Sequence, residues 1–86
     1  MTMNDEPLIL GSALKRPGIG ESDILHALAH VIRAFPEVNE RGPYEMHVGP
    51  ALNASLIEVG LREKYGLLTV FHAMPARRKY TEMLGW

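Results

Sequence analysis

The stretch from Leu67 to Leu84, LLTVFHAMPARRKYTEML, places the tightest limits on the fold of this 86-residue chain. It opens with an almost wholly apolar run, rich in strand-favouring residues, that predicts a buried strand. Pro75 predicts the end of that strand, because proline cannot donate to a sheet ladder but is tolerated in the first turn of a helix. Tyr80, Met83 and Leu84 follow at i, i+3, i+4 spacing, which predicts a short terminal helix.

Three consecutive cations, Arg77, Arg78 and Lys79, come directly after the predicted strand. Basic groups held at the end of a rigid strand suit an anionic ligand, and RNA phosphate is the obvious case. The alternative is a solvated helix face without a ligand, which is the simpler interpretation on composition alone. The formal net charge of −1 argues against a broadly basic nucleic-acid coat, so any phosphate binding would depend on this local patch.

Length and composition predict one domain, residues 1–86, with a single modest core. The chain has no cysteine, which excludes disulfides and thiolate zinc sites. No apolar run approaches the ~20 residues needed to span a bilayer, so no membrane association is expected. The N-terminus is acidic where a signal peptide would be basic, which predicts a cytoplasmic protein. Residues 1–9 are expected to be a loose lead-in, although Pro7–Leu10 could add a short edge strand or start a helix.

Two helices are expected ahead of the strands. Gly11–Arg16 predicts one or two helical turns, because the residue before a proline avoids helical geometry. A longer helix is expected over 22–35, with Ser22 as its cap and Pro36 as its end. This helix is predicted from an apolar stripe at helical spacing, formed by Ile24, Leu25, Leu28, Val31, Ile32 and Phe35.

Three strands are expected next, over Tyr44–Val48, Ser55–Arg62 and Leu67–Phe71. The first two alternate apolar and polar residues, and a turn at 63–66 should join the last two. In the middle strand the alternation predicts the inward residues Ile57, Val59 and Leu61 and the outward residues Glu58 and Arg62. The expected fold class is therefore α+β, with helices packed on a three-stranded antiparallel sheet in the order α-α-β-β-β-α.

One pair of histidines, His26 and His30, has the i, i+4 spacing that places two imidazoles side by side on a helix. A zincin requires glutamate directly after the first histidine, and Ala27 stands there instead. The pair is therefore interpreted as part of a polar helix face, and neither a metal nor another cofactor is predicted.

The other two histidines, His47 and His72, fall on predicted strands. RNA cleavage by the ribose 2′-hydroxyl requires a proton acceptor, a proton donor and positive charge at the phosphate. The sequence from His72 to Tyr80 contains all these residue types. The candidate catalytic residues are therefore His72, Arg77, Lys79 and Tyr80, with His47 as a possible assistant, and the candidate RNA-binding residues are Arg77, Arg78 and Lys79. A structural role for His72 remains open, because Leu68 and Val70 share its strand parity.

The strand over Leu67–Phe71 is apolar on both faces, which is unusual for an antiparallel strand in a small domain. Met83, Leu84 and Trp86 add further apolar surface at the end of the chain. Surfaces of this kind usually mark an interface, so a homodimer is expected.

Three segments, GIGESDILHAL, MHVGPALNASLIEV and TVFHAMPARRKY, resemble small bacterial toxins of the BrnT kind and related short actinobacterial proteins. These belong with the RelE-like ribonucleases, and the resemblance covers roughly residues 12–81. In that family the last strand ends in Ser-Ala-Arg; here His72-Ala73-Met74 stands there, so Arg77 would replace the arginine three residues on. The resemblance implies helices on an antiparallel sheet, a ribonuclease that arrests translation, and a cognate antitoxin.

Residues and resemblance together predict a toxin-like RNA endonuclease that inhibits translation by cleaving mRNA, free or on the ribosome. The alternative is a non-catalytic homodimeric interaction module of the same fold. A small-ligand or metal-binding domain is a third possibility, supported only by His26 and His30.

Overall fold

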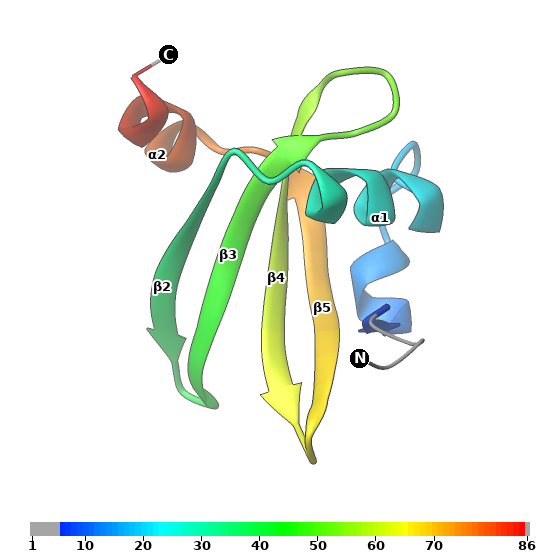
Figure 1. Ribbon diagram of the computed structural model, residues 1–86, viewed down its shortest axis with the longest axis vertical. Coiled ribbons are helices and arrows are strands. Elements are labelled where there is room, and N and C mark those ends of the chain that lie inside the picture. The colour runs from blue at the N-terminus through cyan, green and yellow to red at the C-terminus, as the bar shows by residue number, and fades with distance from the viewer. Residues whose placement is uncertain (1–5, 86) are drawn as a thin grey trace.

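A five-stranded sheet runs through the computed structural model, which describes residues 6–85 (Figure 1). The strand order is β1-β5-β4-β3-β2. β1 pairs with β5 in parallel and every other pair is antiparallel, so the sheet is mixed. The strands are β1 (Leu8–Ile9), β2 (Arg33–Asn39), β3 (Gly42–Pro50), β4 (Leu56–Lys64) and β5 (Leu67–Pro75).

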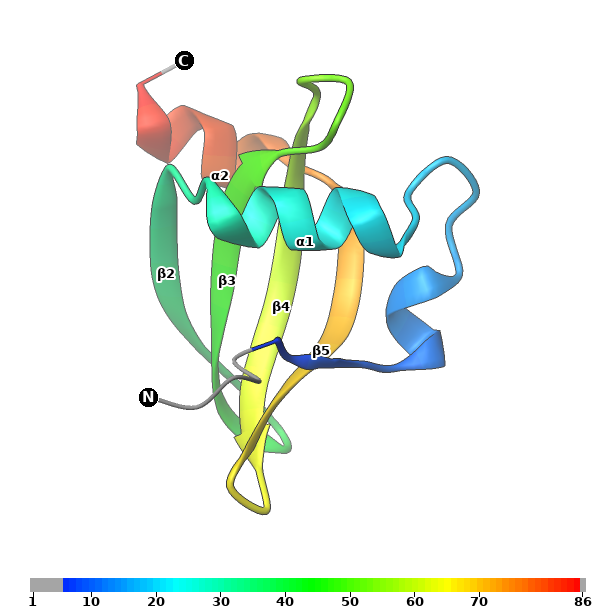
Figure 2. The ribbon, with the colours of Figure 1, turned by 45° about the vertical axis from the view of Figure 1, so that its right-hand side comes forward.

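Two α-helices and two 3₁₀ turns complete the fold. The helix α1 (Glu21–Ala29) lies across one face of the sheet, over β3 and β4 (Figure 2). The short helix α2 (Arg78–Thr81) lies beside the ends of β2 and β3 and continues into a 3₁₀ turn, η2 (Glu82–Leu84) (Figure 2). Another 3₁₀ turn, η1 (Gly11–Leu14), packs against β5. None of the helices in residues 6–85 is long and apolar enough to cross a membrane.

The expected three-stranded antiparallel sheet with the order α-α-β-β-β-α is wrong. The predicted helix over 22–35 ends at Ala29, and the chain then turns into the edge strand β2. Phe35 fits a helical stripe in the sequence, but in the structure it lies in β2 and pairs with Met46 of the adjacent strand β3. Pro36 did not stop a helix, because it lies within an edge strand, where a missing N–H is tolerated.

The N-terminal strand is a second departure from the expected fold. Leu8 and Ile9 pair in parallel with Thr69 and Val70 of β5, so part of the expected loose lead-in is the edge strand β1. The rest of that lead-in, residues 1–5, lies outside the described residues. Trp86, which contributed to the expected dimer surface, also lies outside them.

The three strands predicted after residue 43 are present, with longer bounds. β5 does not end at Phe71 but continues to Pro75, which pairs with Ile57 of β4. The predicted turn between β4 and β5 is confirmed as a two-residue hairpin turn, with Tyr65 at φ 54° and Gly66 at φ 77°. Two residues with positive φ match the twist of the strands that they join.

Apolar cores lie on both faces of the sheet. On one face, the predicted inward residues Ile57, Val59 and Leu61 are buried and belong to the same core cluster as residues of α1. Gly49 lets α1 approach β3 closely, since a Cβ there would overlap the carbonyl oxygen of Ala27. On the other face, α2 and η2 help to cover a second cluster, whose buried members are Phe35, Met46, Val48 and Tyr80.

We call the face of the sheet opposite α1 the open face, because α2 and η2 cover only one end of it (Figures 1 and 2). Side chains alternate between the faces along each strand. The register therefore places on the open face the residues Tyr44 and Met46 of β3, Glu58, Gly60 and Arg62 of β4, and His72 of β5.

Candidate functional site on the open face of the sheet

A buried carboxylate, Glu58, is the centre of a polar cluster on the open face. Its residue is 0% exposed, and its two oxygens accept hydrogen bonds from two side chains and one main-chain N–H. His72 Nε2 lies 2.9 Å from Glu58 Oε2. Arg77 donates from its main-chain N to Oε1 at 2.9 Å and from Nε to Oε2 at 3.0 Å, and its Nη2 forms an ion pair with Oε2 at 2.8 Å.

The environment of Glu58 keeps it ionised. Burial alone opposes ionisation and would raise its pKa, but the hydrogen bonds from His72 and Arg77 outweigh that effect and lower the pKa to about 2. Charged groups are rarely buried without a partner, since an unpaired buried charge costs several kcal/mol. Glu58 therefore depends on Arg77 and His72 for its place in the core.

The ionised carboxylate also determines which tautomer His72 adopts. A carboxylate without a proton can only accept hydrogen bonds, so Nε2 of His72 must carry the hydrogen. In the neutral ring the lone pair is then on Nδ1, the nitrogen that does not contact Glu58. The His72 side chain is 31% exposed, which leaves this ring available to a bound molecule as a proton acceptor.

Arg77 contributes a partly free guanidinium beside His72. Its side chain is 45% exposed, although Nε and Nη2 bind Glu58. Nη1 has no hydrogen-bond partner among residues 6–85 and is the donor left for an anion. A guanidinium oriented by a carboxylate is well suited to phosphate, because its planar donors are fixed in direction.

The ring of Tyr80 brings Lys79 to the same end of the open face as Arg77. Lys79 Nζ lies 4.9 Å and Arg77 Cζ 5.7 Å from the centre of this ring. The Tyr80 hydroxyl is buried and donates to Glu37 Oε2 at 2.7 Å. Burial and the adjacent Glu37 carboxylate raise the pKa of Tyr80 well above its usual value. This hydroxyl is therefore committed to the core, and it is the ring that organises the nearby cations.

Arg78 forms an ion pair outside the Glu58 cluster. Its guanidinium pairs with Glu82 at 3.1 Å, one helical turn along, and its side chain is 88% exposed. Exposed pairs of this kind contribute little to stability. Of the predicted basic triplet, Arg77 and Lys79 thus lie together against Tyr80, and Arg78 is directed to Glu82.

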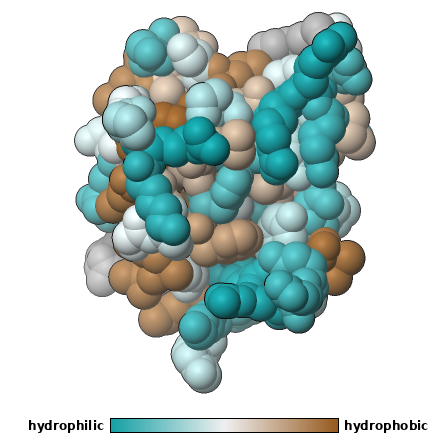
Figure 3. Space-filling view, turned by 180° about the vertical axis from the view of Figure 1, so that it is seen from behind, coloured by the Kyte–Doolittle hydropathy of each residue, from teal (hydrophilic) through white to brown (hydrophobic). Residues whose placement is uncertain are grey.

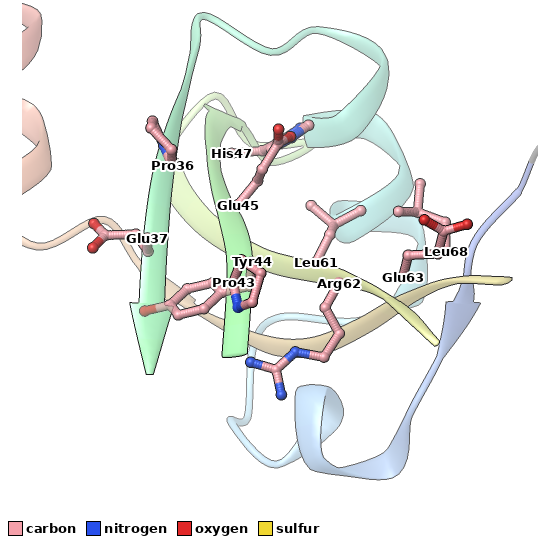
Figure 4. A pocket seen from close by; sticks show the side chains of 10 residues that line it. All are labelled: Pro36, Glu37, Pro43, Tyr44, Glu45, His47, Leu61, Arg62, Glu63 and Leu68. Carbon is pink, nitrogen blue, oxygen red and sulfur yellow. The ribbon is translucent and has the colours of Figure 1, made fainter. Parts of the chain in front are cut away.

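His47 lies on the α1 face of the sheet, because it pairs with Val59 of the core under α1. It contacts Glu45 through Nε2 at 2.8 Å, in a pocket of about 430 Å³ (Figure 4). Figure 4 also shows that Leu61 and Arg62, neighbours on β4, point in opposite directions. The sheet thus separates His47 from the Glu58 cluster, and the structure does not bring the predicted candidates His47 and His72 together.

The remaining histidines, His26 and His30, lie at the C-terminal end of α1. His26 Nδ1 lies 2.8 Å from the carbonyl oxygen of Pro50, so this nitrogen donates and ties α1 to the end of β3. The two rings are stacked obliquely, with centroids 4.5 Å apart. His26 therefore has a structural role at the junction of α1 and β3.

Sequence reasoning missed the role of Glu58, which was expected only to face outward from the core. It does lie opposite Ile57 and Val59, but a second core and α2 cover that side of β4 as well. One signal was available: Glu58 stands within the otherwise apolar run LIEVGL, and a charge in such a run implies a buried partner.

The fold and the site together define a small α+β protein with a mixed sheet and an acid–histidine–arginine cluster at the covered end of its open face. Comparisons with models of protein families, with curated proteins and with solved structures found no match.

Proposed function

We propose that the protein is an RNA endonuclease that cleaves by attack of a ribose 2′-hydroxyl on the adjacent phosphate. The observation that carries the proposal is the contact set of Glu58, His72 and Arg77 on the open face. One buried carboxylate there orients both an imidazole and a guanidinium, and each keeps a solvent-exposed edge. This combination supplies a proton acceptor and an anion-binding group, as such a reaction requires.

Charge at the site supports the binding of a phosphodiester. The charge of Glu58 is paired with that of Arg77, and Arg77 Nη1 is the donor that an arriving phosphate would meet. Lys79 adds a second cation near the ring of Tyr80. In this proposal Arg77 and Lys79 hold the phosphate oxygens and offset the negative charge that develops in the transition state.

The proton transfers of the reaction can be assigned to His72 and water. His72 Nδ1 takes the proton of the 2′-hydroxyl while the 2′-oxygen forms a bond to phosphorus. The bond from phosphorus to the 5′-oxygen breaks, and the departing oxygen takes a proton from water. The resulting hydroxide and the proton on His72 combine, which leaves a 2′,3′-cyclic phosphate, a 5′-hydroxyl and neutral His72. Glu58 is a positioning residue, since it holds the tautomer of His72.

The biological role we propose is that of a toxin that arrests translation by cutting mRNA, free or on the ribosome. It is supported by the resemblance of three segments to BrnT-like and RelE-like proteins and by the shared contact of His72 and Arg77 with Glu58. A cognate antitoxin is part of this proposal, and it would inhibit most directly by covering the open face.

Incubation of the purified protein with single-stranded RNA, alone and on translating ribosomes, tests the proposal. Cleavage should yield 2′,3′-cyclic phosphate ends, and an RNA carrying 2′-O-methyl groups throughout should resist cutting. Induced expression should also slow growth, and His72→Ala should relieve that effect. Products ending in 3′-hydroxyls would contradict attack by the 2′-oxygen, and intact RNA in both reactions would remove the ribonuclease proposal.

A homodimeric interaction module is the second candidate, favoured by exposed apolar residues at one end of β5. Leu67 and Leu68 are 57% and 48% exposed, and Leu8, next to them in β1, is 53% exposed. We propose dimerisation through this group whichever function holds. Light scattering at high micromolar concentration should detect a dimer that Leu68→Ser weakens, and a monomer under these conditions would remove the idea.

A further inference from the structure

We infer that Tyr44, Arg62 and Phe71 form a binding site for a base of single-stranded RNA, next to the cluster around Glu58. The inference rests on the proposed function for its ligand, because it gives the substrate of the same site a second contact. It concerns the uncovered half of the open face, beyond the end that α2 covers.

An irregularity in strand pairing brings Phe71 and His72 to the same face. Gly60 pairs with His72 and Leu61 pairs with Val70, so Phe71 is an extra residue in β5. A bulge of this kind redirects side chains, and bulges are common beside functional sites. A Cβ on Gly60 would lie 3.1 Å from Phe71 Cζ and 3.2 Å from His72 Cβ, so the glycine leaves room for the Phe71 ring on the open face.

Phe71 is the middle member of a continuous row of flat groups. Its ring centroid lies 6.4 Å from that of His72 and 5.3 Å from that of Tyr44. The guanidinium of Arg62 lies 4.7 Å from the Phe71 ring and 5.6 Å from the Tyr44 ring. Unpaired RNA bases stack on aromatic rings and on guanidinium planes of this kind.

The charges around this row suit the RNA backbone. A hollow of about 400 Å³ adjoins Arg62 and Phe71, and its charged lining is one acid, Glu63, with three cations, Arg41, Arg62 and Lys64. Arg62 Nη2 donates to Asn39 Oδ1 at 2.9 Å, but Arg62 Nε is buried and has no partner among residues 6–85. An unpaired buried donor is costly, so the guanidinium is not fully satisfied by the contacts that it makes in this arrangement.

The distance between the two sites excludes a single nucleotide as the occupant of both. Glu58 and Arg62 are four positions apart in β4, which is ~13 Å along a strand. A phosphate at Arg77 and a base at Arg62 therefore belong to a segment of more than one nucleotide.

Figure 3 shows the face seen from the side opposite α1, with hydrophilic side chains around paler and brown atoms. Bases must be unpaired to stack on such a surface, which selects single strands over duplexes.

Binding of a fluorescent RNA of about eight nucleotides tests the inference, since single-strand sites commonly span ~4–16 nucleotides. The probe carries 2′-O-methyl groups, so that it cannot be cleaved. Phe71→Leu and Arg62→Lys should each raise its Kd about 5- to 100-fold, because each removes a stacking surface. Arg62→Lys keeps the charge, so its salt dependence should match that of the unmodified protein.

Tyr65→Leu is the matched control, because Tyr65 is a 93% exposed aromatic residue in the turn between β4 and β5. It should leave the Kd within about twofold. Far-UV circular dichroism establishes that each variant is folded, and Arg62→Lys alone decides the outcome if Phe71→Leu unfolds. Unchanged Kd values for the folded subsite variants, or equal affinity for a duplex of the same sequence, would overturn the inference.

The fate of the proposed function can be separated from that of the base site. If the protein cuts RNA and the subsite variants cut with unchanged KM, the base site is wrong and the ribonuclease proposal stands. If Phe71→Leu and Arg62→Lys no longer bind the 2′-O-methyl RNA but the unmodified protein cuts no RNA, the base site stands and the ribonuclease proposal falls.

Discussion

Glu58 and Arg77 are joined twice, once through the guanidinium and once through the main-chain N–H of Arg77. These contacts link β4 to the residue that directly precedes α2. The same carboxylate holds His72. One buried acid therefore sets the position of a helix and of both groups that we assign to RNA cleavage.

Acid should destabilise the protein through Glu58. A pKa of about 2 in the folded state, against 4.5 ordinarily, means that the unfolded chain binds more protons between these values. The stabilisation is present above about pH 4.5 and is lost as the pH falls toward 2, by about 3 kcal/mol in total. Denaturant melts over this range measure it. In Glu58→Gln the free energy of unfolding should fall less steeply with acid, and a slope equal to that of the unmodified protein would contradict the assignment.

Replacing Lys79 should affect RNA binding without affecting folding. Lys79→Ala removes one phosphate contact, so the log–log dependence of affinity on salt should flatten by about 0.7 for single-stranded RNA. Arg78→Ala is the comparison, and it should change the slope less because Arg78 is engaged with Glu82. If both variants flatten the salt dependence equally, the different side-chain contacts of Lys79 and Arg78 do not decide which of them binds RNA.

Tyr80→Phe should lower the free energy of unfolding and leave the rate of RNA cleavage unchanged. It removes the donor to Glu37 and leaves that carboxylate partly buried, at a cost of about 1–3 kcal/mol in the free energy of unfolding. Thermal melts and single-turnover cleavage at low temperature separate the two effects. A variant that is fully folded but has lost cleavage would instead assign the Tyr80 hydroxyl to the reaction.

Gly49→Ala tests the packing of α1 on the sheet. A methyl group there would overlap the carbonyl of Ala27, so the helix must shift, at a cost of about 1–3 kcal/mol. Gly11→Ala is the matched control, since a Cβ at that position meets nothing within 4 Å, and its effect should stay within about 0.5 kcal/mol. Similar melting curves for the two variants would mean that α1 does not approach β3 so closely.

Sequence patterns predicted the three central strands, because β3 and β4 alternate apolar and polar residues and β5 begins as an almost wholly apolar run. They failed at β2, where the spacing of Val31, Ile32 and Phe35 also fits a helix. Only the partner strand decides between the two, since Phe35 is buried by pairing with Met46 and packing against Tyr80. The sequence offers β1 only as one of several alternatives for Pro7–Leu10, because two paired residues leave no periodicity to detect.

The candidate site, too, could be predicted only in part from the sequence. His72 and Arg77 could be identified, because a histidine can transfer protons and a cation near a strand end can bind an anion. Glu58 could not be linked to them, since the link depends on the register of β4 and β5 and on where α2 begins. The bulge at Phe71 is likewise invisible in the sequence, although it decides which face that ring occupies.

The most direct test of the account compares cleavage rate and RNA affinity in His72→Ala. Single-turnover cleavage of an unmodified RNA gives the rate, and the 2′-O-methyl probe gives the affinity. If His72 is the proton acceptor, its loss should lower the rate by about 10²–10⁴-fold and leave the Kd within a few-fold. If His72→Ala cuts RNA at the rate of the unmodified protein, or if its affinity falls by the same factor as its cleavage rate, the assignment of the reaction to His72 is contradicted.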